Sequence, residues 1–183
     1  DEYFKKVLNA GDLNLCDGMG LRIFTGIKRI PGVDFMVEVC KLAAEQGRGV
    51  YLLGSGNDEV VKKTAETLQK KFPSLKISGY DKGPIISENI QYPISNIQLS
   101  NNSDADILFV AFSMGKQEKW IYENLAKMPS VKVAMGVGGS FDFISGKVKR
   151  APLFLRRLGL EWMYRLIQEP RRFVRIFNAT VKF

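Results

Sequence analysis

Short apolar segments recur along the chain and predict buried β-strands. The clearest lie at 50–54, 107–112 and 131–139, and a weaker one lies at 75–80. Short, mainly apolar runs of this kind are typical of strands that are covered on both faces in a parallel sheet. The pattern therefore predicts a layered protein with helices on either side of a sheet.

Amphipathic stretches at 33–46, 57–72 and 116–128 predict helices between these strands. In the second stretch apolar residues recur at helical spacing, while lysines occupy the other face. Asn57 or Asp58 can cap its start. Strands that alternate with helices favour an α/β fold with an open, mostly parallel sheet and right-handed crossovers.

Two regions depart from this alternation. Residues 84–103 contain two prolines and a polar, turn-rich stretch, which predicts a short or kinked helix and then a loop. After Pro152 the sequence predicts two basic helices, the first over 153–169 and the second over 171–183. These helices form an addition to the sheet rather than another strand–helix unit.

The composition is that of an ordinary globular protein. The chain has 183 residues, of which 45% are hydrophobic and 25% are charged, and this excludes a collagen-like, disordered or disulfide-stapled chain. Its apolar runs are shorter than the roughly 20 residues of a bilayer-spanning helix, and its first residues do not resemble a signal peptide. Cys16 and Cys40 fit no metal-binding spacing, so we expect two buried thiols in a reducing cytoplasm.

The net charge of +8 is concentrated near the end of the chain. Ten basic and two acidic residues lie between Lys147 and Phe183, while residues 1–146 are neutral. This asymmetry indicates an anionic partner, such as nucleic acid, lipid headgroups or a phosphorylated substrate, and a solvated helical face would give the same pattern. We expect a sheet domain over 1–150 and a basic helical appendage over 151–183.

The absence of histidine limits the chemistry of the chain. It excludes a Ser-His-Asp triad and a histidine-bound zinc ion, so acid–base work falls on carboxylates, lysine, tyrosine or cysteine. Asp104 and Asp106 resemble a metal-binding pair, but they precede the strand at 107–112 and so lie at its amino end. Ligands bind at the opposite edge of such a sheet. The sequence therefore predicts a solvated turn at this pair and no metal site.

Glycine-bearing loops follow three of the predicted strands, at 54–58, 78–83 and 136–142. Ligands of open parallel sheets bind beyond the carboxyl ends of the strands, where glycine lets the backbone approach closely. Glu59 stands where a dinucleotide fingerprint has its third glycine, which disfavours NAD. The loops therefore predict a site for a ligand that carries phosphate or hydroxyl groups.

Polar residues also mark two other strand ends. Lys116, Gln117 and Glu118 lie where a helix begins, which suits a diphosphate or a sugar, or else the solvated start of a helix. Asp17 lies in LNLCDGMG (13–20), where alternating leucines predict a short strand that ends near the aspartate. A carboxylate in that position is a candidate general base, and equally a candidate helix cap.

Four motifs occur together and in order: CDGMG (16–20), GKQEKW (115–120), GVGGSFDFISGKVKRAP (136–152) and GLEWMYRLIQEPRR (159–172). They resemble the WecG/TagA/CpsF family of glycosyltransferases, glycosyltransferase family 26. The resemblance implies a Rossmann-like sheet with a helical C-terminal appendage. It also implies an inverting, metal-independent transfer of N-acetylmannosamine from its UDP donor to the 4-hydroxyl of GlcNAc on undecaprenyl diphosphate. The linkage would be β-1,4, as in the linkage unit of teichoic acid.

The resemblance also implies roles for individual residues. Asp17 matches the proposed general base, and Gln117 matches a glutamine of the active site. The polar and glycine-bearing positions above are then expected to bind the UDP-sugar through Gly54, Ser55, Gly79, Tyr80, Lys116, Gly136, Gly138 and Asp142. The appendage is expected to bind diphosphate through Arg165, Arg172 and Arg175. The family usually has proline where this chain has Gly115.

The expected partners follow from the same reaction. They are a UDP-sugar donor, a polyprenyl-diphosphate-linked GlcNAc acceptor and the inner face of the cytoplasmic membrane, where the basic appendage would dock peripherally. We expect no cofactor, and a homo-oligomer is compatible with the apolar tail. One alternative is the same fold with UDP-ManNAcA or UDP-glucose as donor. A second is a nucleic-acid-binding module built on the tail, against which the neutral body and the ligand-type loops argue.

Overall fold

The computed structural model describes residues 2–18, 22, 24–83 and 104–168. The chain divides into two compact units, Asp1–Lys147 and Val148–Phe183. The kinked helix expected within 84–103 and the second basic helix expected over 171–183 lie outside the described residues.

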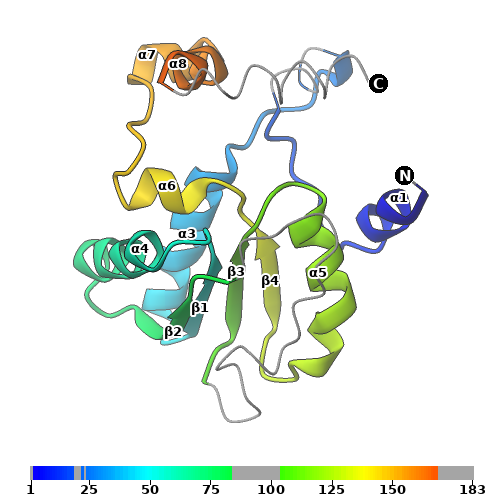
Figure 1. Ribbon diagram of the computed structural model, residues 1–183, viewed down its shortest axis with the longest axis vertical. Coiled ribbons are helices and arrows are strands. Elements are labelled where there is room, and N and C mark those ends of the chain that lie inside the picture. Colours follow the sequence, from blue (N-terminus) through cyan, green and yellow to red (C-terminus); the bar gives the residue numbers. More distant parts are fainter. Residues whose placement is uncertain (1, 19–21, 23, 84–103, 169–183) are drawn as a thin grey trace. The chain divides into compact units, whose positions relative to one another are not determined.

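The first unit is built on an open sheet of parallel strands (Figure 1). The strands are β1 (Gly49–Gly54), β2 (Lys76–Asp81), β3 (Ile107–Ala111) and β4 (Val133–Gly136). Their order is β2-β1-β3-β4, and each neighbouring pair is parallel. This confirms the expected α/β class and parallel sheet. The predicted strand at 131–139 was too long, because the chain leaves the sheet after Gly136 and turns into a short helix.

The chain changes its direction across the sheet at β1. It moves from β1 outward to β2, then crosses to β3 on the other side of β1, and ends at β4. In open α/β folds, ligands bind beside such a switch point, here between the ends of β1 and β3. Gly54 and Ala111 are aligned there as neighbours. We call the edge of the sheet at which all four strands end the carboxyl edge.

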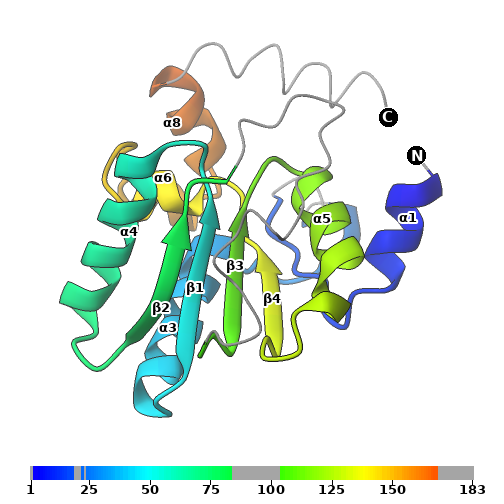
Figure 2. The ribbon, with the colours of Figure 1, turned by 60° about the horizontal axis from the view of Figure 1, so that its bottom comes forward.

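Helices cover both faces of the sheet (Figures 1 and 2). One face is covered by α3 (Gly32–Glu45), α4 (Asp58–Lys71) and α6 (Ser140–Ile144). Their apolar side chains form one core with β1 and β3, in which Met36, Leu52 and Phe141 are completely buried. Burying such side chains is the main favourable term in folding.

The other face is covered by α5 (Lys116–Asn124) and the 3₁₀ turn η2 (Leu125–Lys127). There Trp120 packs with Leu108 and Val110 in a second core. α1 (Glu2–Asn9) lies beside α5, joined to it by the Tyr3 hydroxyl, which donates to Glu123 over 2.7 Å (Figure 2). The predicted helix at 116–128 therefore exists, but its last turn is a 3₁₀ turn.

Asn57 caps α4, which is one of the two caps that the sequence predicted. Its side-chain oxygen accepts hydrogen bonds from the backbone N–H groups of Glu59 at 2.9 Å and Val60 at 3.2 Å. These donors have no acceptor within the helix, and such a cap stabilises a helix by about 1 kcal/mol.

The two cysteines lie in different environments, so the expectation of two buried thiols is right for only one of them. Cys40 of α3 is fully buried, and this burial raises the pKa of its thiol to about 12. The Cys40 side chain therefore stays neutral at pH 7 and behaves as a small apolar group. Cys16 is partly exposed in the segment that precedes α3, and both thiols are free.

The segment around Asp17 does not form the expected strand. Residues 13–18 have no regular secondary structure. Instead, the carbonyl of Cys16 accepts from the backbone N–H of Ile30 over 2.9 Å. Because this contact joins the segment to the chain just before α3, a tertiary hydrogen bond replaces the strand that alternating leucines predicted.

The second unit contains two short helices, α7 (Leu153–Arg157) and α8 (Glu161–Gln168). The single helix predicted over 153–169 was wrong, because Gly159 adopts a left-handed φ of 76° between them. The unit also contains a partly buried ion pair in which Arg150 Nε donates to Glu161 over 3.1 Å. Among the described residues of the whole chain, no helix is both long enough and apolar enough to cross a bilayer.

Candidate functional site at the carboxyl edge

The backbones of three strands meet closely at the switch point. Gly54 has a φ of +120°, and a β-carbon there would lie only 2.7 Å from the carbonyl atoms of Ala111. A β-carbon on Gly83 would lie 3.3 Å from the Cα of Gly54. The glycine at position 54 is therefore required by the close approach of β1 to β3, a structural reason that sequence reasoning did not identify.

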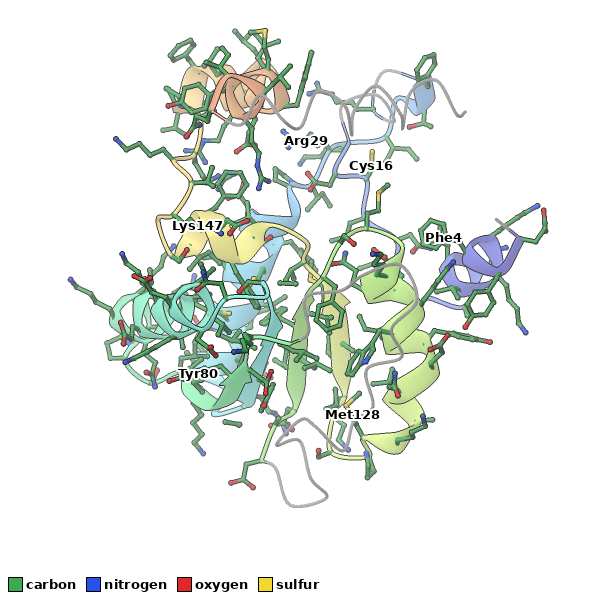
Figure 3. All side chains as sticks on the ribbon, viewed as in Figure 1. Phe4, Cys16, Arg29, Tyr80, Met128 and Lys147 are labelled. Carbon is green, nitrogen blue, oxygen red and sulfur yellow. The ribbon has the colours of Figure 1, made fainter. Side chains whose placement is uncertain are left out.

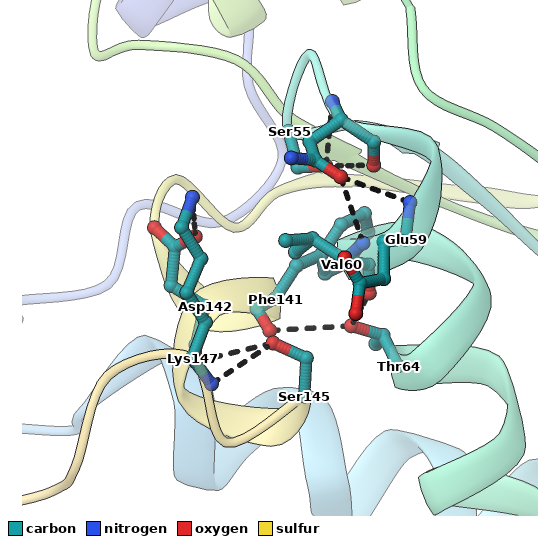
Figure 4. A network of polar contacts seen from close by, with 9 residues as sticks. Ser55, Glu59, Val60, Thr64, Phe141, Asp142, Ser145 and Lys147 are labelled. Atoms are coloured by element: carbon teal, nitrogen blue, oxygen red, sulfur yellow. Dashed lines mark hydrogen bonds and ion pairs between the residues drawn. The ribbon is translucent and has the colours of Figure 1, made fainter.

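Ser55 begins the loop after β1 and has a positive φ of 77°, which is uncommon for a residue with a side chain. Its backbone N–H donates to the Ala111 carbonyl over 2.9 Å. Its hydroxyl donates to the Asn57 carbonyl over 3.1 Å, in the turn that leads into α4 (Figure 4). Gly56 completes the arrangement by donating to the Lys82 carbonyl over 2.8 Å. Hydrogen bonds thus fix this loop to the ends of both neighbouring strands.

Gln117 lies in the first turn of α5 and is buried, with 6% of the residue exposed. Its side-chain oxygen accepts from the backbone N–H of Gly138 over 2.9 Å, and its side-chain nitrogen donates to Glu118 over 2.9 Å. A β-carbon at Gly136 would lie 2.6 Å from that nitrogen. Three residues predicted for the site, Gln117, Gly136 and Gly138, are therefore brought together, and the two glycines accommodate the glutamine.

Lys116 begins α5 beside this cluster and is half-buried. Asp142, on α6, forms an ion pair with Lys147 over 3.3 Å (Figure 4). α6 is also tied to α4, because the buried Thr64 hydroxyl makes hydrogen bonds to the carbonyls of Val60 at 2.8 Å and Phe141 at 3.2 Å. The end of β4 therefore leads into a short helix that is held firmly against α4.

Asp17 lies at the start of α3. That helix leads into β1 through a short turn, so its N-terminus lies near the carboxyl edge, and Figure 3 shows Cys16 and Arg29 side by side on that side of the sheet. Arg29 donates to the Asp17 carbonyl over 2.6 Å and to the carboxylate oxygen Oδ1 over 3.2 Å. The other oxygen, Oδ2, faces Gly32, where a β-carbon would lie 3.5 Å from it.

The Asp17 carboxylate is both oriented and accessible. Its side chain is 57% exposed, whereas that of Arg29 is only 15% exposed. The N-terminus of a helix carries a partial positive charge that favours a carboxylate beside it. Asp17 is not buried by packing, and the start of the segment that it could cap, residues 19–21, lies outside the described residues. The geometry agrees with a polar group that faces solvent or a ligand.

Gly79 and Tyr80 lie within β2, so the predicted loop at 78–83 begins four residues too early. Gly79 is paired with Tyr51 in the register, and a β-carbon there would lie 2.6 Å from the Tyr51 ring. Its lack of a side chain makes room for this ring. Tyr80 is 45% exposed on the same strand.

The aspartates before β3 lie at the amino end of the sheet, as predicted. They do not form a plain solvated turn, however, because Asp106 anchors the sheet. Its carboxylate accepts from the backbone N–H of Gly49 at 3.1 Å and from Arg48 at 3.2 Å. This is a structural role for one residue of the pair at the edge away from the site.

The three appendage arginines are only partly described. Arg165 is a half-buried residue of α8, and Arg172 and Arg175 lie outside the described residues. Arg156 of α7 has a buried Nε atom without a hydrogen-bond partner among the described residues. The second unit is therefore rich in guanidinium groups, some of which lie partly inside it.

At the carboxyl edge, sequence reasoning missed Arg29 and named Glu118 without its capping contact. Arg29, which orients Asp17, lies twelve positions away and had no local signal. Glu118 accepts from the backbone N–H of Gly115 over 2.7 Å. The three-residue spacing from Gly115 to Glu118 is that of a capping box, so this contact had a signal in the sequence.

Comparisons with known proteins bear on this site. A family model described as "Glycosyl transferase WecG/TagA/CpsF family" matches residues 1–183. The chain is 34% identical to the N-acetylglucosaminyldiphosphoundecaprenol N-acetyl-beta-D-mannosaminyltransferase of Bacillus subtilis (strain 168), over 97% of this chain and 68% of that protein. A protein of the same name from Staphylococcus aureus (strain MW2) is 36% identical, over 98% of this chain and 70% of its own length.

Proposed function

The chain belongs to the glycosyl transferase WecG/TagA/CpsF family, and from this membership we propose that it transfers N-acetylmannosamine from UDP-ManNAc to GlcNAc on undecaprenyl diphosphate. The name of the similar Bacillus and Staphylococcus proteins supports the sugar and the acceptor. The observation that carries the proposal for this chain is Asp17, an exposed and oriented carboxylate near the carboxyl edge of a parallel sheet.

Asp17 is the general base in this proposal. It takes the proton from the 4-hydroxyl of GlcNAc while that oxygen attacks C1 of the donor sugar. The bond from C1 to the diphosphate breaks, and its electron pair leaves with UDP. Attack opposite to the leaving group inverts the configuration at C1 and gives a β-1,4 linkage. Positioned bases of this kind contribute about 10²–10⁴-fold to a rate, and the Arg29 contacts supply the positioning.

The departing UDP gathers negative charge, which positive groups must stabilise. In a metal-independent reaction the candidates are Lys116 at the start of α5 and the appendage residues Arg165, Arg172 and Arg175. Arginine suits this role because its planar group can bind two phosphate oxygens at once. The uridine diphosphate is expected against the loops after β1 and β4, beside Ser55, Gly138 and Asp142.

Turnover with a soluble lipid-diphosphate-GlcNAc analogue and a panel of UDP-sugars tests the proposal. We expect transfer from UDP-ManNAc and formation of UDP, with chelator present to test metal independence. Transfer only from UDP-ManNAcA or UDP-glucose would indicate that the enzyme takes part in the synthesis of another surface polysaccharide. Salt-dependent binding of DNA or RNA with no sugar transfer would favour the nucleic-acid module instead.

The appendage is proposed to bind the inner face of the cytoplasmic membrane, where the lipid acceptor lies. Large apolar side chains are exposed on α7, on α8 and at Leu158 between them, namely Leu153, Phe154, Leu158, Trp162, Met163 and Ile167. Arginines lie between them, and near an anionic leaflet each basic residue is worth about 1 kcal/mol. Apolar side chains among basic ones are typical of helices that lie in a membrane interface.

Flotation with anionic liposomes checks this surface. Phe154→Asp and Ile167→Asp are each expected to weaken binding at least tenfold, because each removes an apolar group worth roughly 1.5–3 kcal/mol when buried. Leu42→Asp is the matched control, since Leu42 is also exposed but lies on α3 of the first unit. Equal retention of all variants would reject the membrane role. Mass measurement with and without detergent would then show whether the same side chains join copies of the chain.

A further inference from the structure

Glu118 uses both oxygens of its carboxylate in the first turn of α5. Oε2 accepts from the backbone N–H of Gly115 over 2.7 Å, and Oε1 accepts from the Gln117 side-chain nitrogen over 2.9 Å. An ionised carboxylate accepts at both oxygens, so it satisfies two donors at once. The first contact caps the helix, but the second has no part in capping.

The contact to Gln117 fixes the orientation of a buried amide. With its nitrogen bonded to Glu118, the Gln117 side chain directs its oxygen at the backbone N–H of Gly138, which donates to it over 2.9 Å. The opposite orientation would set an NH₂ group against the Gly138 N–H and an oxygen against the carboxylate. Both neighbours therefore select the same orientation, and a buried donor left without an acceptor is costly.

The same amide joins two loops at the carboxyl edge. Gln117 follows β3, whereas Gly136 and Gly138 end and follow β4. The amide lies over Gly136 so closely that a β-carbon there would be 2.6 Å from its nitrogen. With 6% of Gln117 exposed, this is a packed junction. The loop after β4 is thus attached to the start of α5 through one side chain.

We propose that Glu118 is a positioning residue of the transfer site. It acts through Gln117 to hold the Gly138 turn against α5, so that the UDP-sugar meets a wall that is already formed. The part of this inference that concerns turnover rests on the proposed function. Preformed sites of this kind raise rates because their polar groups need not reorganise during the reaction.

Glu118→Gln tests the inference, because the substituted amide has a single acceptor oxygen for two donors. We expect hydrogen exchange at the Gly138 amide to become roughly three- to tenfold faster, the factor that a typical hydrogen bond is worth. We also expect kcat/KM for UDP-ManNAc to fall roughly 10- to 100-fold, because small displacements at a reacting centre are that costly. KM for the acceptor analogue and the exchange of β3 amides should stay as in the wild type.

Exchanging the two side chains gives a rescue. In the double variant Gln117→Glu with Glu118→Gln, the carboxylate at position 117 can accept from Gly138 and from the amide at position 118. That amide's oxygen can accept from Gly115, so the three hydrogen bonds are restored. Gly138 exchange should therefore be slow in the double variant and fast in Gln117→Glu alone, where two carboxylates face each other. The criterion for rescue is the return of slow exchange at the Gly138 amide. Turnover is not used as the criterion, because Gln117 itself is placed in the site.

Glu123→Gln is the matched control, since it removes the same charge from the same helix at a residue that contacts Tyr3. It should leave Gly138 exchange and turnover unchanged. Wild-type exchange in Glu118→Gln, or no rescue in the double variant, overturns the positioning role. If Glu118→Gln shows fast Gly138 exchange but an undiminished kcat/KM, Glu118 holds the turn without contributing to sugar transfer, and the proposed positioning role in the reaction is overturned. If the wild-type protein transfers no sugar, the proposed function fails, while the exchange measurements still decide whether Glu118 holds Gln117.

Discussion

Asp17→Asn is expected to lower kcat for sugar transfer by about 10²–10⁴-fold, the usual contribution of a positioned general base. The asparagine oxygen can still accept a hydrogen bond from Arg29, as Asp17 Oδ1 does over 3.2 Å in the wild type. The amide cannot take a proton from the acceptor hydroxyl at neutral pH. Affinity for the UDP-sugar, measured by calorimetry, should therefore be unchanged while turnover is lost.

Asp12→Asn is the control for this experiment, because Asp12 is an exposed aspartate of the same segment. It removes the same charge and should keep full turnover. Near-normal turnover in Asp17→Asn would reject the assignment of the base and would leave the fold and the family unaffected. Loss of UDP-sugar binding together with turnover would instead make Asp17 part of the donor site.

Gly54→Ala is expected to lower the free energy of unfolding by roughly 2–5 kcal/mol, since it combines backbone strain with overpacking. The φ of +120° is strained for any residue with a side chain, and the new methyl group would lie 2.7 Å from the carbonyl of Ala111. Neither strand can retreat without breaking the sheet. Urea unfolding followed by circular dichroism measures the loss, which is a large share of the 5–15 kcal/mol of a typical domain.

Gly47→Ala separates the two causes. Gly47 also has a positive φ, of +63°, but a β-carbon there meets no atom within 4 Å. It should therefore cost only about 1 kcal/mol, the penalty of the left-handed conformation. If Gly54→Ala is no more destabilising than Gly47→Ala, the close approach of β1 to β3 is not what requires glycine at position 54.

The four strands and their alternation with α3, α4 and α5 followed from the sequence alone, whereas α1 and α6 were not predicted. The apolar runs at 50–54 and 107–112 correspond to β1 and β3, and the capping residue Asn57 correctly predicted the start of α4. Each of these signals is local, because a run of apolar side chains or a capping residue specifies its own segment. The rule that ligands bind where parallel strands end then selected the polar residues at the start of α5.

Errors arose where a local pattern continued across a break. Helical spacing runs through 153–169, but Gly159 takes a left-handed φ and splits the helix. Leu13 and Leu15 alternate as in a strand, yet this segment has no partner strand among the described residues. Periodicity reports which positions are apolar, and it does not report whether hydrogen-bond partners exist.

The sequence by itself determined the α/β class, the strand–helix alternation and the family, because these depend on residue patterns that are read along the chain. Only the tertiary structure decided that Arg29 orients Asp17 and that Glu118, through Gln117, holds the turn at Gly138. Asp17 and Arg29 are twelve positions apart, and Gln117 and Gly138 lie on different loops. These residues meet because the sheet brings the ends of its strands together. A pattern read along the chain does not specify which residues will meet there.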